Sequence, residues 1–190
     1  MDPVDVEETY LLIDGENIDA TLGLSVLERR PTPEERPRWD RIREATEQLW
    51  NQHVRGLFFL NGSSGYLPMG FIQALHAMGY RALPLAGPED MKVVDVGIQR
   101  TLEAIAHKGE GSVILASHDA DFLPQIQELL ENGHRVGIMC FKEFLSSQFH
   151  ELEDMGLEII DLEYDAHAFQ VQLPRIHIID IDAFDPFDYI

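Results

Sequence analysis

Short apolar runs alternate with segments of helical spacing along most of the chain, and this alternation limits the fold to one class. The runs predict strands because they are brief and bounded by turn residues; they are Thr9–Ile13, Val54–Leu60, Arg81–Leu85, Val113–Ala116, Arg135–Phe141 and Leu157–Leu162. The segments between them predict helices, around Ile18–Val26, Trp39–Trp50, Pro68–Met78, Val94–Ile105, Phe122–Glu131 and Ser146–Asp154. Such alternation predicts an α/β fold, in which helices cover both faces of a parallel sheet.

The length and composition indicate one ordinary globular domain. A chain of 190 residues is long enough for one well-buried core and short for two. Hydrophobic residues make up 45% of the chain and charged residues 25%, the usual balance for a water-soluble protein. No apolar run approaches the length of a membrane span, and Met1–Glu8 lacks the basic-then-apolar order of a signal peptide. We therefore expect a cytoplasmic protein without a membrane partner, whose single cysteine, Cys140, is a buried thiol.

The formal net charge of −20, from 34 acidic and 14 basic residues, bears on the choice of partner. Nucleic-acid-binding proteins usually present a basic face, because phosphate contacts dominate their affinity. The densest positive cluster is Arg29, Arg30, Arg36 and Arg38, in or just after the proline-rich stretch Glu28–Pro37. We interpret this stretch as an exposed, solvated loop, since its arginines follow no regular period. A polyanion would therefore have to be held by bound cations and a few local basic side chains.

A turn with two aspartates follows the predicted strand Val113–Ala116. The turn reads Ser117-His118-Asp119-Ala120-Asp121, and a helical pattern begins directly after it. In open α/β sheets ligands bind just beyond the carboxyl ends of the strands, so both carboxylates are predicted at the edge where chemistry usually takes place. A helix N-cap is the alternative reason for an aspartate here, but a cap needs only one.

Further carboxylates are expected at the same edge of the sheet. Asp14 ends the first predicted strand, and Asp95 lies at the start of the fourth predicted helix. Together with Asp119 and Asp121 they form a set that repels itself unless protons or cations neutralise it. Oxygen ligands without an accompanying cysteine favour Mg²⁺ or Mn²⁺ over zinc. Such an ion suits the activation of a water for attack on a phosphodiester.

Two polar side chains fit a phosphate-handling role beside this set. Asn17, one turn into the first helix, is placed to orient a carboxylate, a water or a phosphate oxygen, and Lys92 is placed to neutralise a phosphate. Each also has an ordinary interpretation, as a helix-entry asparagine and as an exposed loop lysine. His118 stays open between a substrate contact and a bystander.

Other catalytic templates are absent from the sequence. It has no glycine-rich phosphate loop, no HExxH zinc motif and no G-x-S-x-G nucleophile elbow, and Cys140 has no recognisable partner. An aspartyl-phosphate mechanism would also place an aspartate after the first strand. The Asp-x-Asp start of the haloacid-dehalogenase-type phosphatases is missing, because Asp14 is followed by Gly15 and Glu16.

The chain after Leu162 is less regular, so we predict a domain over 1–162 and a C-terminal extension over 163–190. Within the extension, Arg175–Ile181 alternates weakly and is a candidate edge strand. The end of the chain is an acidic tail with aromatic residues between its aspartates, which are Asp180, Asp182, Asp185 and Asp188. We expect this tail to be solvated, with a weak divalent-ion site as the alternative, although its spacing is not that of an EF-hand.

With these features the chain resembles an NYN domain of the PIN-like nuclease superfamily, in its LabA-like group. Four pieces match in order and spacing, over about Thr9–Leu162: Leu11-Leu12-Ile13-Asp14-Gly15-Glu16-Asn17, Lys92-Val93-Val94-Asp95-Val96, Ser117-His118-Asp119-Ala120-Asp121-Phe122 and Ser147-Gln148-Phe149-His150-Glu151-Leu152. The chain departs from the pattern at Thr101, where family members often have a further aspartate. The stretch Glu28–Pro37 and the extension lie outside the pattern.

The resemblance implies a Rossmann-like (PIN-like) sheet with a carboxylate pocket for Mg²⁺ or Mn²⁺, and metal-dependent cleavage of RNA by an activated water. The acidic residues carried over by position are metal ligands and catalytic groups, with Asp119 ligating metal or positioning water: Asp14, Asp95, Asp119 and Asp121. The polar residues carried over handle the phosphate: Asn17, Lys92 and Ser117. Because Thr101 stands where family members often have an aspartate, the resemblance implies a weakened second metal site, while binding of one ion is less affected.

Three functions are consistent with the sequence. The leading hypothesis is a Mg²⁺- or Mn²⁺-dependent ribonuclease, with RNA as its partner. The second is a non-catalytic regulatory or adaptor protein that keeps the fold, which the net charge of −20 and Thr101 favour. The third is a phosphatase or nucleotidase. A second copy of the chain and a separate protein partner both stay open, since no interface can be named from the sequence.

Overall fold

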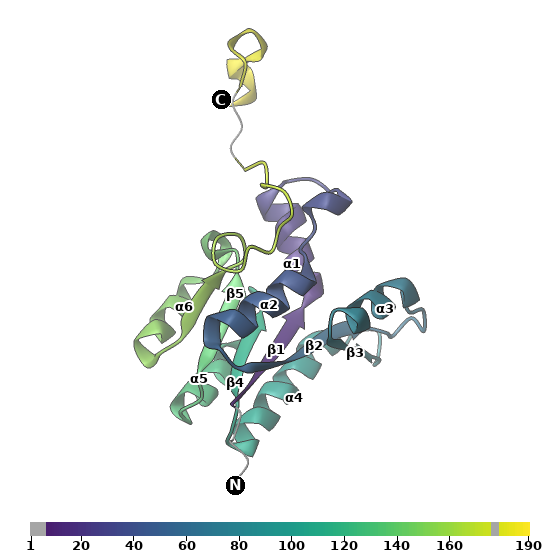
Figure 1. Ribbon diagram of the computed structural model, residues 1–190. Coiled ribbons are helices and arrows are strands. Elements are labelled where there is room, and N and C mark those ends of the chain that lie inside the picture. The colour runs from purple at the N-terminus through teal and green to yellow at the C-terminus, as the bar shows by residue number, and fades with distance from the viewer. Residues whose placement is uncertain (1–6, 176–178) are drawn as a thin grey trace.

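One parallel sheet forms the centre of the molecule. The computed structural model describes residues 7–175 and 179–190. Its strands are hydrogen-bonded in the order β3-β2-β1-β4-β5-β6, and every neighbouring pair is parallel (Figure 1). The strands are β1 Glu8–Asp14, β2 His53–Asn61, β3 Tyr80–Leu85, β4 Ser112–Ala116, β5 Val136–Cys140 and β6 Glu158–Asp161. The predicted parallel sheet is confirmed, and each strand ends within one residue of its predicted end.

Helices cover both faces of the sheet, as predicted. They are α1 Gly15–Thr21, α2 Trp39–Trp50, α3 Met69–Ala77, α4 Val93–Lys108, α5 Leu123–Glu131 and α6 Ser147–Glu151. Successive side chains of a strand point to opposite faces. Leu12 of β1 therefore packs into a core with α4 and α5, whereas Leu11 and Ile13 pack into a second core with α1 and α2. Among the described residues, no helix has the length and apolar character needed to cross a membrane.

The direction of the chain across the sheet reverses between β1 and β4. From β1 the chain moves outward to β2 and β3, then returns through α4 to β4 on the other side of β1. The connections after β1 and β4 therefore leave on opposite faces, which opens a crevice at the carboxyl ends of these two strands. Asp14 is the last residue of β1, and Ser117 directly follows β4. The fold thus brings two of the predicted site residues to the place where ligands bind in sheets of this kind.

Two connections differ from what the sequence suggests. The helix after β1 is not regular to its predicted end, because α1 continues as a π-helical turn over Leu22–Val26. The arginine-containing stretch Glu28–Pro37 is mostly exposed, as predicted, but the guanidinium of Arg29 donates two hydrogen bonds of 2.8 and 2.7 Å to the buried carboxylate of Glu35. This pair fixes the loop, so part of its positive charge is neutralised locally.

The chain after β6 returns over the core before it reaches the tail. Ala166, Ala168 and Leu173 are buried against the second core, and the backbone amide of Arg38 donates to the carbonyl of Ala168 at 2.7 Å. The described ends of the candidate edge strand Arg175–Ile181 are not in a strand, and Ile181 begins a 3₁₀ turn. Its middle, residues 176–178, lies outside the described residues. Residues 179–190 contain two short 3₁₀ turns (Figure 1). Most of their apolar side chains are exposed.

Gly15, which follows the first aspartate, has no room for a side chain. A Cβ built on Gly15 would lie 2.6 Å from Cζ of Phe58, whose buried ring packs edge-on against Trp39. We expect Gly15→Ala to lower the free energy of unfolding by about 1–3 kcal/mol, as overpacking does in a filled core. Urea denaturation measures the change. Gly70→Ala is the matched control, since no atom lies within 4 Å of a Cβ there; equal effects of the two variants would contradict this packing.

Candidate metal centre

Asp14 is buried in the crevice between β1 and β4. Its side chain is only 3% exposed, and its Oδ2 accepts a hydrogen bond of 2.8 Å from the hydroxyl of Ser117. Burial raises the pKa of Asp14 to about 6, and the negative charges of Asp95 and Asp119 add to the rise, while the Ser117 hydrogen bond opposes it. Asp14 can therefore hold or release a proton close to neutral pH.

The turn after β4 organises its two aspartates in different ways. The carboxylate of Asp119 accepts a hydrogen bond of 2.9 Å from the amide of Asp121, so Asp119 caps the 3₁₀ turn Ala120–Phe122. The amide of Asp119 in turn donates to the hydroxyl of Ser117 at 3.2 Å. Capping thus accounts for one aspartate, and Asp121 is left exposed with its carboxylate free of the cap.

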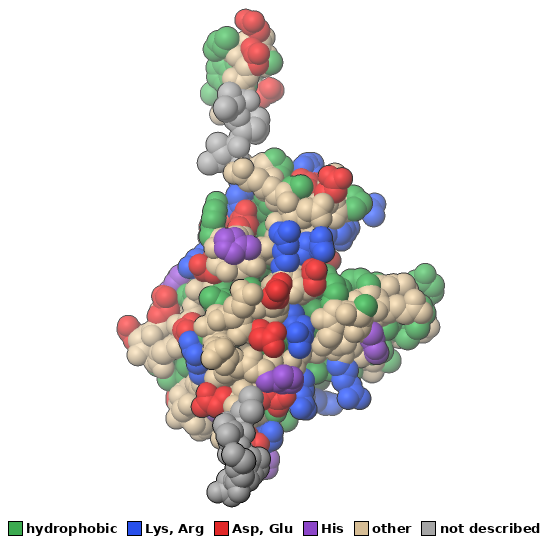
Figure 2. All heavy atoms as spheres, in the orientation of Figure 1, with side chains coloured by type: hydrophobic (Ala, Val, Ile, Leu, Met, Phe, Trp, Pro, Cys, Tyr) green, Lys and Arg blue, Asp and Glu red, His purple; other side chains and the backbone are tan. Residues whose placement is uncertain are grey.

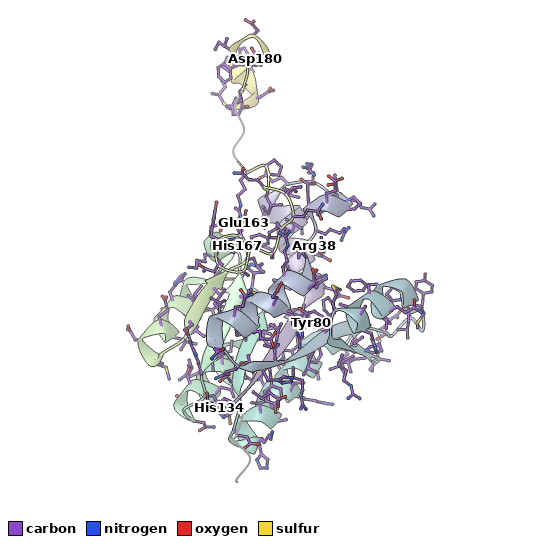
Figure 3. The ribbon with its side chains drawn as sticks, viewed as in Figure 1. Arg38, Tyr80, His134, Glu163, His167 and Asp180 are labelled. Atoms are coloured by element: carbon purple, nitrogen blue, oxygen red, sulfur yellow. The ribbon has the colours of Figure 1, made fainter. Side chains whose placement is uncertain are left out.

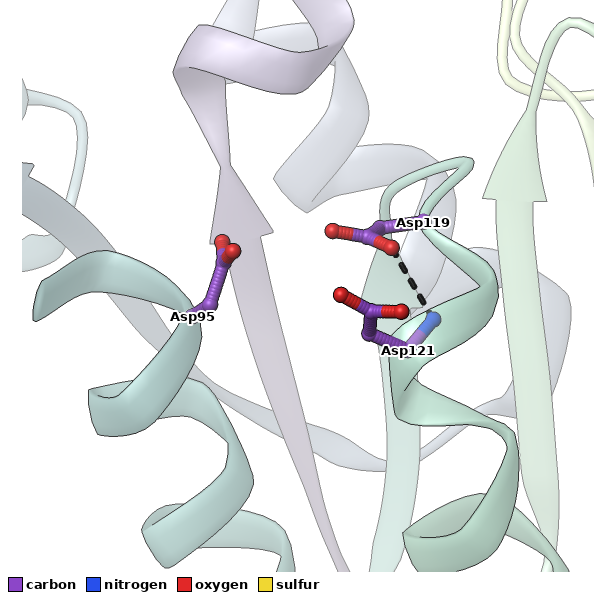
Figure 4. A group of neighbouring side chains, drawn as sticks. All are labelled: Asp95, Asp119 and Asp121. Atoms are coloured by element: carbon purple, nitrogen blue, oxygen red, sulfur yellow. Dashed lines mark hydrogen bonds between the residues drawn. The ribbon is translucent and has the colours of Figure 1, made fainter. Parts of the chain in front are cut away.

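Asp95 faces this turn from the first helical turn of α4. Figure 4 shows its carboxylate opposite those of Asp119 and Asp121. One carboxylate oxygen from each of the three residues lies within 4.8 Å of the others. Burial raises the pKa of Asp95, and the neighbouring negative charges, that of Asp119 first among them, raise it further, while Lys92 lowers it. Three of the four predicted acidic residues therefore converge, and Asp14 lies behind them, bonded to Ser117.

The three converging carboxylates have the chemistry of a site for a hard divalent cation. With the usual Mg–O distance of about 2.1 Å, adjacent ligand oxygens of an octahedral Mg²⁺ lie roughly 3.0 Å apart and opposite ones roughly 4.2 Å. The three carboxylate oxygens lie within 4.8 Å of one another, so they have to move closer together to hold one ion, and Asp121 is exposed. The donor set consists of oxygen alone, as Mg²⁺ and Mn²⁺ prefer. The residues present therefore fit the ion that the sequence predicts.

Asn17 and His118 connect the start of α1 to the turn after β4. Oδ1 of Asn17 accepts a hydrogen bond of 2.8 Å from the amide of His118 and lies 3.0 Å from Nδ1 of its ring. Nε2 of the same ring accepts a hydrogen bond of 2.8 Å from the amide of Phe141. An accepting Nε2 leaves the proton on Nδ1, which then donates to Asn17. Burial lowers the pKa of His118 to about 4, so the ring is neutral near pH 7.

The remaining predicted residues occupy different surroundings. Lys92 is largely exposed, with its Nζ 4.0 Å from Oδ2 of Asp95, where it can meet an incoming anion. Thr101 lies further along α4, and its hydroxyl donates to the carbonyl of Gly97 at 2.8 Å, within its own helix. Glu16 was not singled out from the sequence. It is exposed in the first turn of α1, and its charge contributes to the raised pKa of Asp95.

A sizeable hollow lies away from this site. It has a volume of about 610 Å³ and lies at the amino ends of the strands, where Tyr10, Lys108 and His134 line it. Figure 3 shows His134 at the end of the molecule opposite to Glu163 and Arg38. Lys108 is already paired with Glu110 at 2.8 Å, and Arg135, another lining residue, with Glu158 at 2.7 Å. The carboxylates therefore remain the better candidate for chemistry.

The raised pKa of Asp14 makes stability depend on pH. Between pH 3.8 and about 6 the folded protein keeps a proton that the unfolded chain has lost, so the stability of the metal-free protein falls as pH rises through this window. We expect Asp14→Asn, measured by urea denaturation in EDTA, to raise the free energy of unfolding by about 1–3 kcal/mol at pH 7. The gain should shrink towards pH 4. Asp154→Asn, at an exposed position, is the control, and a gain that is independent of pH would contradict the assignment.

Comparisons with known proteins bear on the family and the fold. The sequence model of the NYN domain family matches residues 8–161. A crystal structure of a Vibrio parahaemolyticus protein of unknown function, VPA0982, is similar with a TM-score of 0.65 and 17% identity, over 87% of this chain and 98% of that one. YcaC from Pseudomonas aeruginosa is a weaker match, with a TM-score of 0.43 and 13% identity over 84% of this chain and 78% of that one.

A search of curated proteins gives no match to the sequence. The family match covers most of the chain and includes every residue of the candidate centre. The LabA-like group within the family stays a prediction. The chain belongs to the NYN domain family, with the parallel sheet of a PIN-like fold.

Proposed function

We propose that the chain is a ribonuclease that hydrolyses RNA phosphodiester bonds with Mg²⁺ or Mn²⁺. The observation that carries this proposal is the convergence of Asp95, Asp119 and Asp121 at the carboxyl edge of the sheet, with the buried Asp14 behind them. Membership of a nuclease-like family supports it. Cleavage of cellular RNA is also consistent with the cytoplasmic location that the sequence predicts.

Each residue has a distinct task in this proposal. The carboxylates of Asp95, Asp119 and Asp121 would hold the ion. When bound, a divalent cation supplies positive charge beside the scissile phosphate and lowers the pKa of a water. Lys92, exposed beside Asp95, contacts a phosphate oxygen. Asp14 accepts the Ser117 hydroxyl bond and so holds the turn in place, and its pKa of about 6 lets it exchange a proton during the reaction.

Electrostatics make the cation essential for substrate binding as well as for chemistry. The chain has a formal net charge of −20, and acidic and basic side chains are interspersed on the face in Figure 2. Long-range attraction to RNA is therefore weak, and affinity depends on neutralisation at the site itself. We infer that RNA binding requires the divalent ion more strictly than it does in nucleases with a basic face.

Cleavage of a mixed RNA panel in Mg²⁺, Mn²⁺ or EDTA is the direct test. We expect cutting that EDTA abolishes, and rates lowered by about 100-fold or more in Asp95→Asn and in Asp121→Asn, since each removes a ligand. An Asp14→Asn/Asp121→Asn double variant should be inactive. Asp154→Asn removes an acidic group of the same kind elsewhere on the surface and should cut like the unchanged protein.

The other outcomes separate the rival functions. Cleavage that survives in the double variant would show that the carboxylates are not the catalytic groups. Metal binding without cleavage of any RNA would favour the regulatory or adaptor function, and Thr101→Asp would then test whether the missing acid is the cause. Turnover of small phosphomonoesters in place of RNA would favour a phosphatase.

Lys92→Ala tests the phosphate contact separately. Loss of one phosphate contact should raise KM with little change in kcat, and should reduce the slope of log affinity against log salt by about one. Lys108→Ala is the control, because Lys108 lies at the amino edge of the sheet beside Glu110. A fall in kcat with unchanged KM would instead place Lys92 in the chemical step.

A further inference from the structure

Three stacked rings run from the carboxylate turn to the C-terminal extension. The ring of His118 stacks on Phe141, with centroids 5.8 Å apart and planes at 11°. Phe141 stacks in turn on Phe169, with centroids 5.7 Å apart and planes at 25°. We call these three rings the ring stack. Phe141 is fully buried, so the stack passes through the interior of the protein.

One end of the ring stack is fixed to the candidate metal centre. His118 lies between Ser117, which bonds to Asp14, and Asp119, one of the converging carboxylates. Its two ring nitrogens are both used, by Asn17 on one side and by the amide of Phe141 on the other. The backbone amide of His118, which belongs to the turn, bonds to the same Asn17 oxygen as its ring. We therefore expect a displaced His118 ring to displace the turn.

The other end is fixed by the extension and the start of α2. The guanidinium of Arg41 donates to the carbonyl of Phe169 at 2.9 Å, and the amide of Arg38 donates to the carbonyl of Ala168 at 2.7 Å. The guanidinium of Arg175 lies over the ring of Phe141, the middle ring of the stack, 5.4 Å from its centre. This guanidinium is held by the carboxylates of Glu143 and Glu163.

We propose that the C-terminal extension is part of the metal centre, and that Phe169 and His118 are positioning residues that hold the turn 117–121 through the ring stack. The proposal deepens the proposed function and rests on it, because it assigns the stack a task in ion binding. It also gives a task to the extension, which lies outside the family pattern, and to a histidine whose ring nitrogens both bond within the protein. Simple core packing would stabilise the whole domain without a selective effect on the turn.

The test compares Phe169→Ala with Tyr164→Ala. Tyr164 is an aromatic residue of the same extension, but it is 75% exposed and has no part in the stack. Hydrogen–deuterium exchange of the Asp119 and Asp121 amides reports the order of the turn, with amides of α5 and β5 as the internal reference. Calorimetric titration with Mn²⁺ alone reports ion binding.

In Phe169→Ala we expect faster exchange in the turn than in the reference elements, and Mn²⁺ affinity lowered by about threefold to tenfold. His118→Ala should lower the affinity by about tenfold. Tyr164→Ala should match the unchanged protein in both measurements. Phe169→Leu, which keeps the bulk of the side chain, serves if Phe169→Ala fails to fold, and it should show the same selective exchange to a smaller degree.

The failure of this proposal is distinguishable from that of the proposed function. Exchange that rises equally in the turn and in the reference elements, with Mn²⁺ affinity unchanged, would overturn the role of the ring stack while RNA cleavage stands. If the unchanged protein neither binds Mn²⁺ nor cuts RNA, the proposed function fails. The proposal, which assigns the stack a task in ion binding, is then overturned with it, and selective exchange in Phe169→Ala would show only a structural link.

Discussion

Repulsion between the carboxylates of the candidate metal centre destabilises the fold, and the packing of the rest of the structure has to offset it. Three carboxylate oxygens lie within 4.8 Å of one another at the crevice, and a fourth carboxyl, Asp14, is buried directly behind them. Two hydrophobic cores, one on each face of the sheet, hold β1 and β4 in place, and the acidic side chains follow from the elements so positioned. Burial is the main cause of the raised pKa of Asp14, and the negative charges of Asp95 and Asp119 add to it. The carboxylates lower the stability of the ion-free fold at the place where an ion would bind, as is common at functional sites.

The distribution of positive charge shows how the protein tolerates its excess of acid. Arg29 binds Glu35 and Arg135 binds Glu158, both at 2.7 Å, so much of the basic complement neutralises neighbouring acids on the surface. Lys92 is paired at the candidate metal centre, because its Nζ lies 4.0 Å from Oδ2 of Asp95. Basic side chains stand among acidic ones on the face in Figure 2, so that face offers a polyanion no broad basic surface. Such a protein selects by local chemistry more than by long-range attraction.

The sheet could be predicted closely from the sequence, because strands such as Val113–Ala116 are local apolar runs with clear turn residues at their ends. The gathering of Asp14, Asp95 and the two aspartates of the turn followed from the order of the elements, since parallel strands place their carboxyl ends at one edge. The separation of Asp14 from the other three depends on the Ser117 hydroxyl, a contact over 103 positions that no local pattern encodes. The contact of Phe141 with Phe169 was invisible for the same reason: neither residue has a periodicity that identifies its neighbour.

The packing of the extension also shows that the end of the family match and the end of the hydrophobic core are two different boundaries. The family match ends at residue 161, but Ala166, Ala168 and Leu173 beyond it are buried, and they cover apolar surface shared with β1 and α2. A chain cut at the end of the match would expose that surface to water. The stretch that the family model matches is thus shorter than the stretch that completes the hydrophobic core. In this protein, the family pattern and the buried core end at different residues.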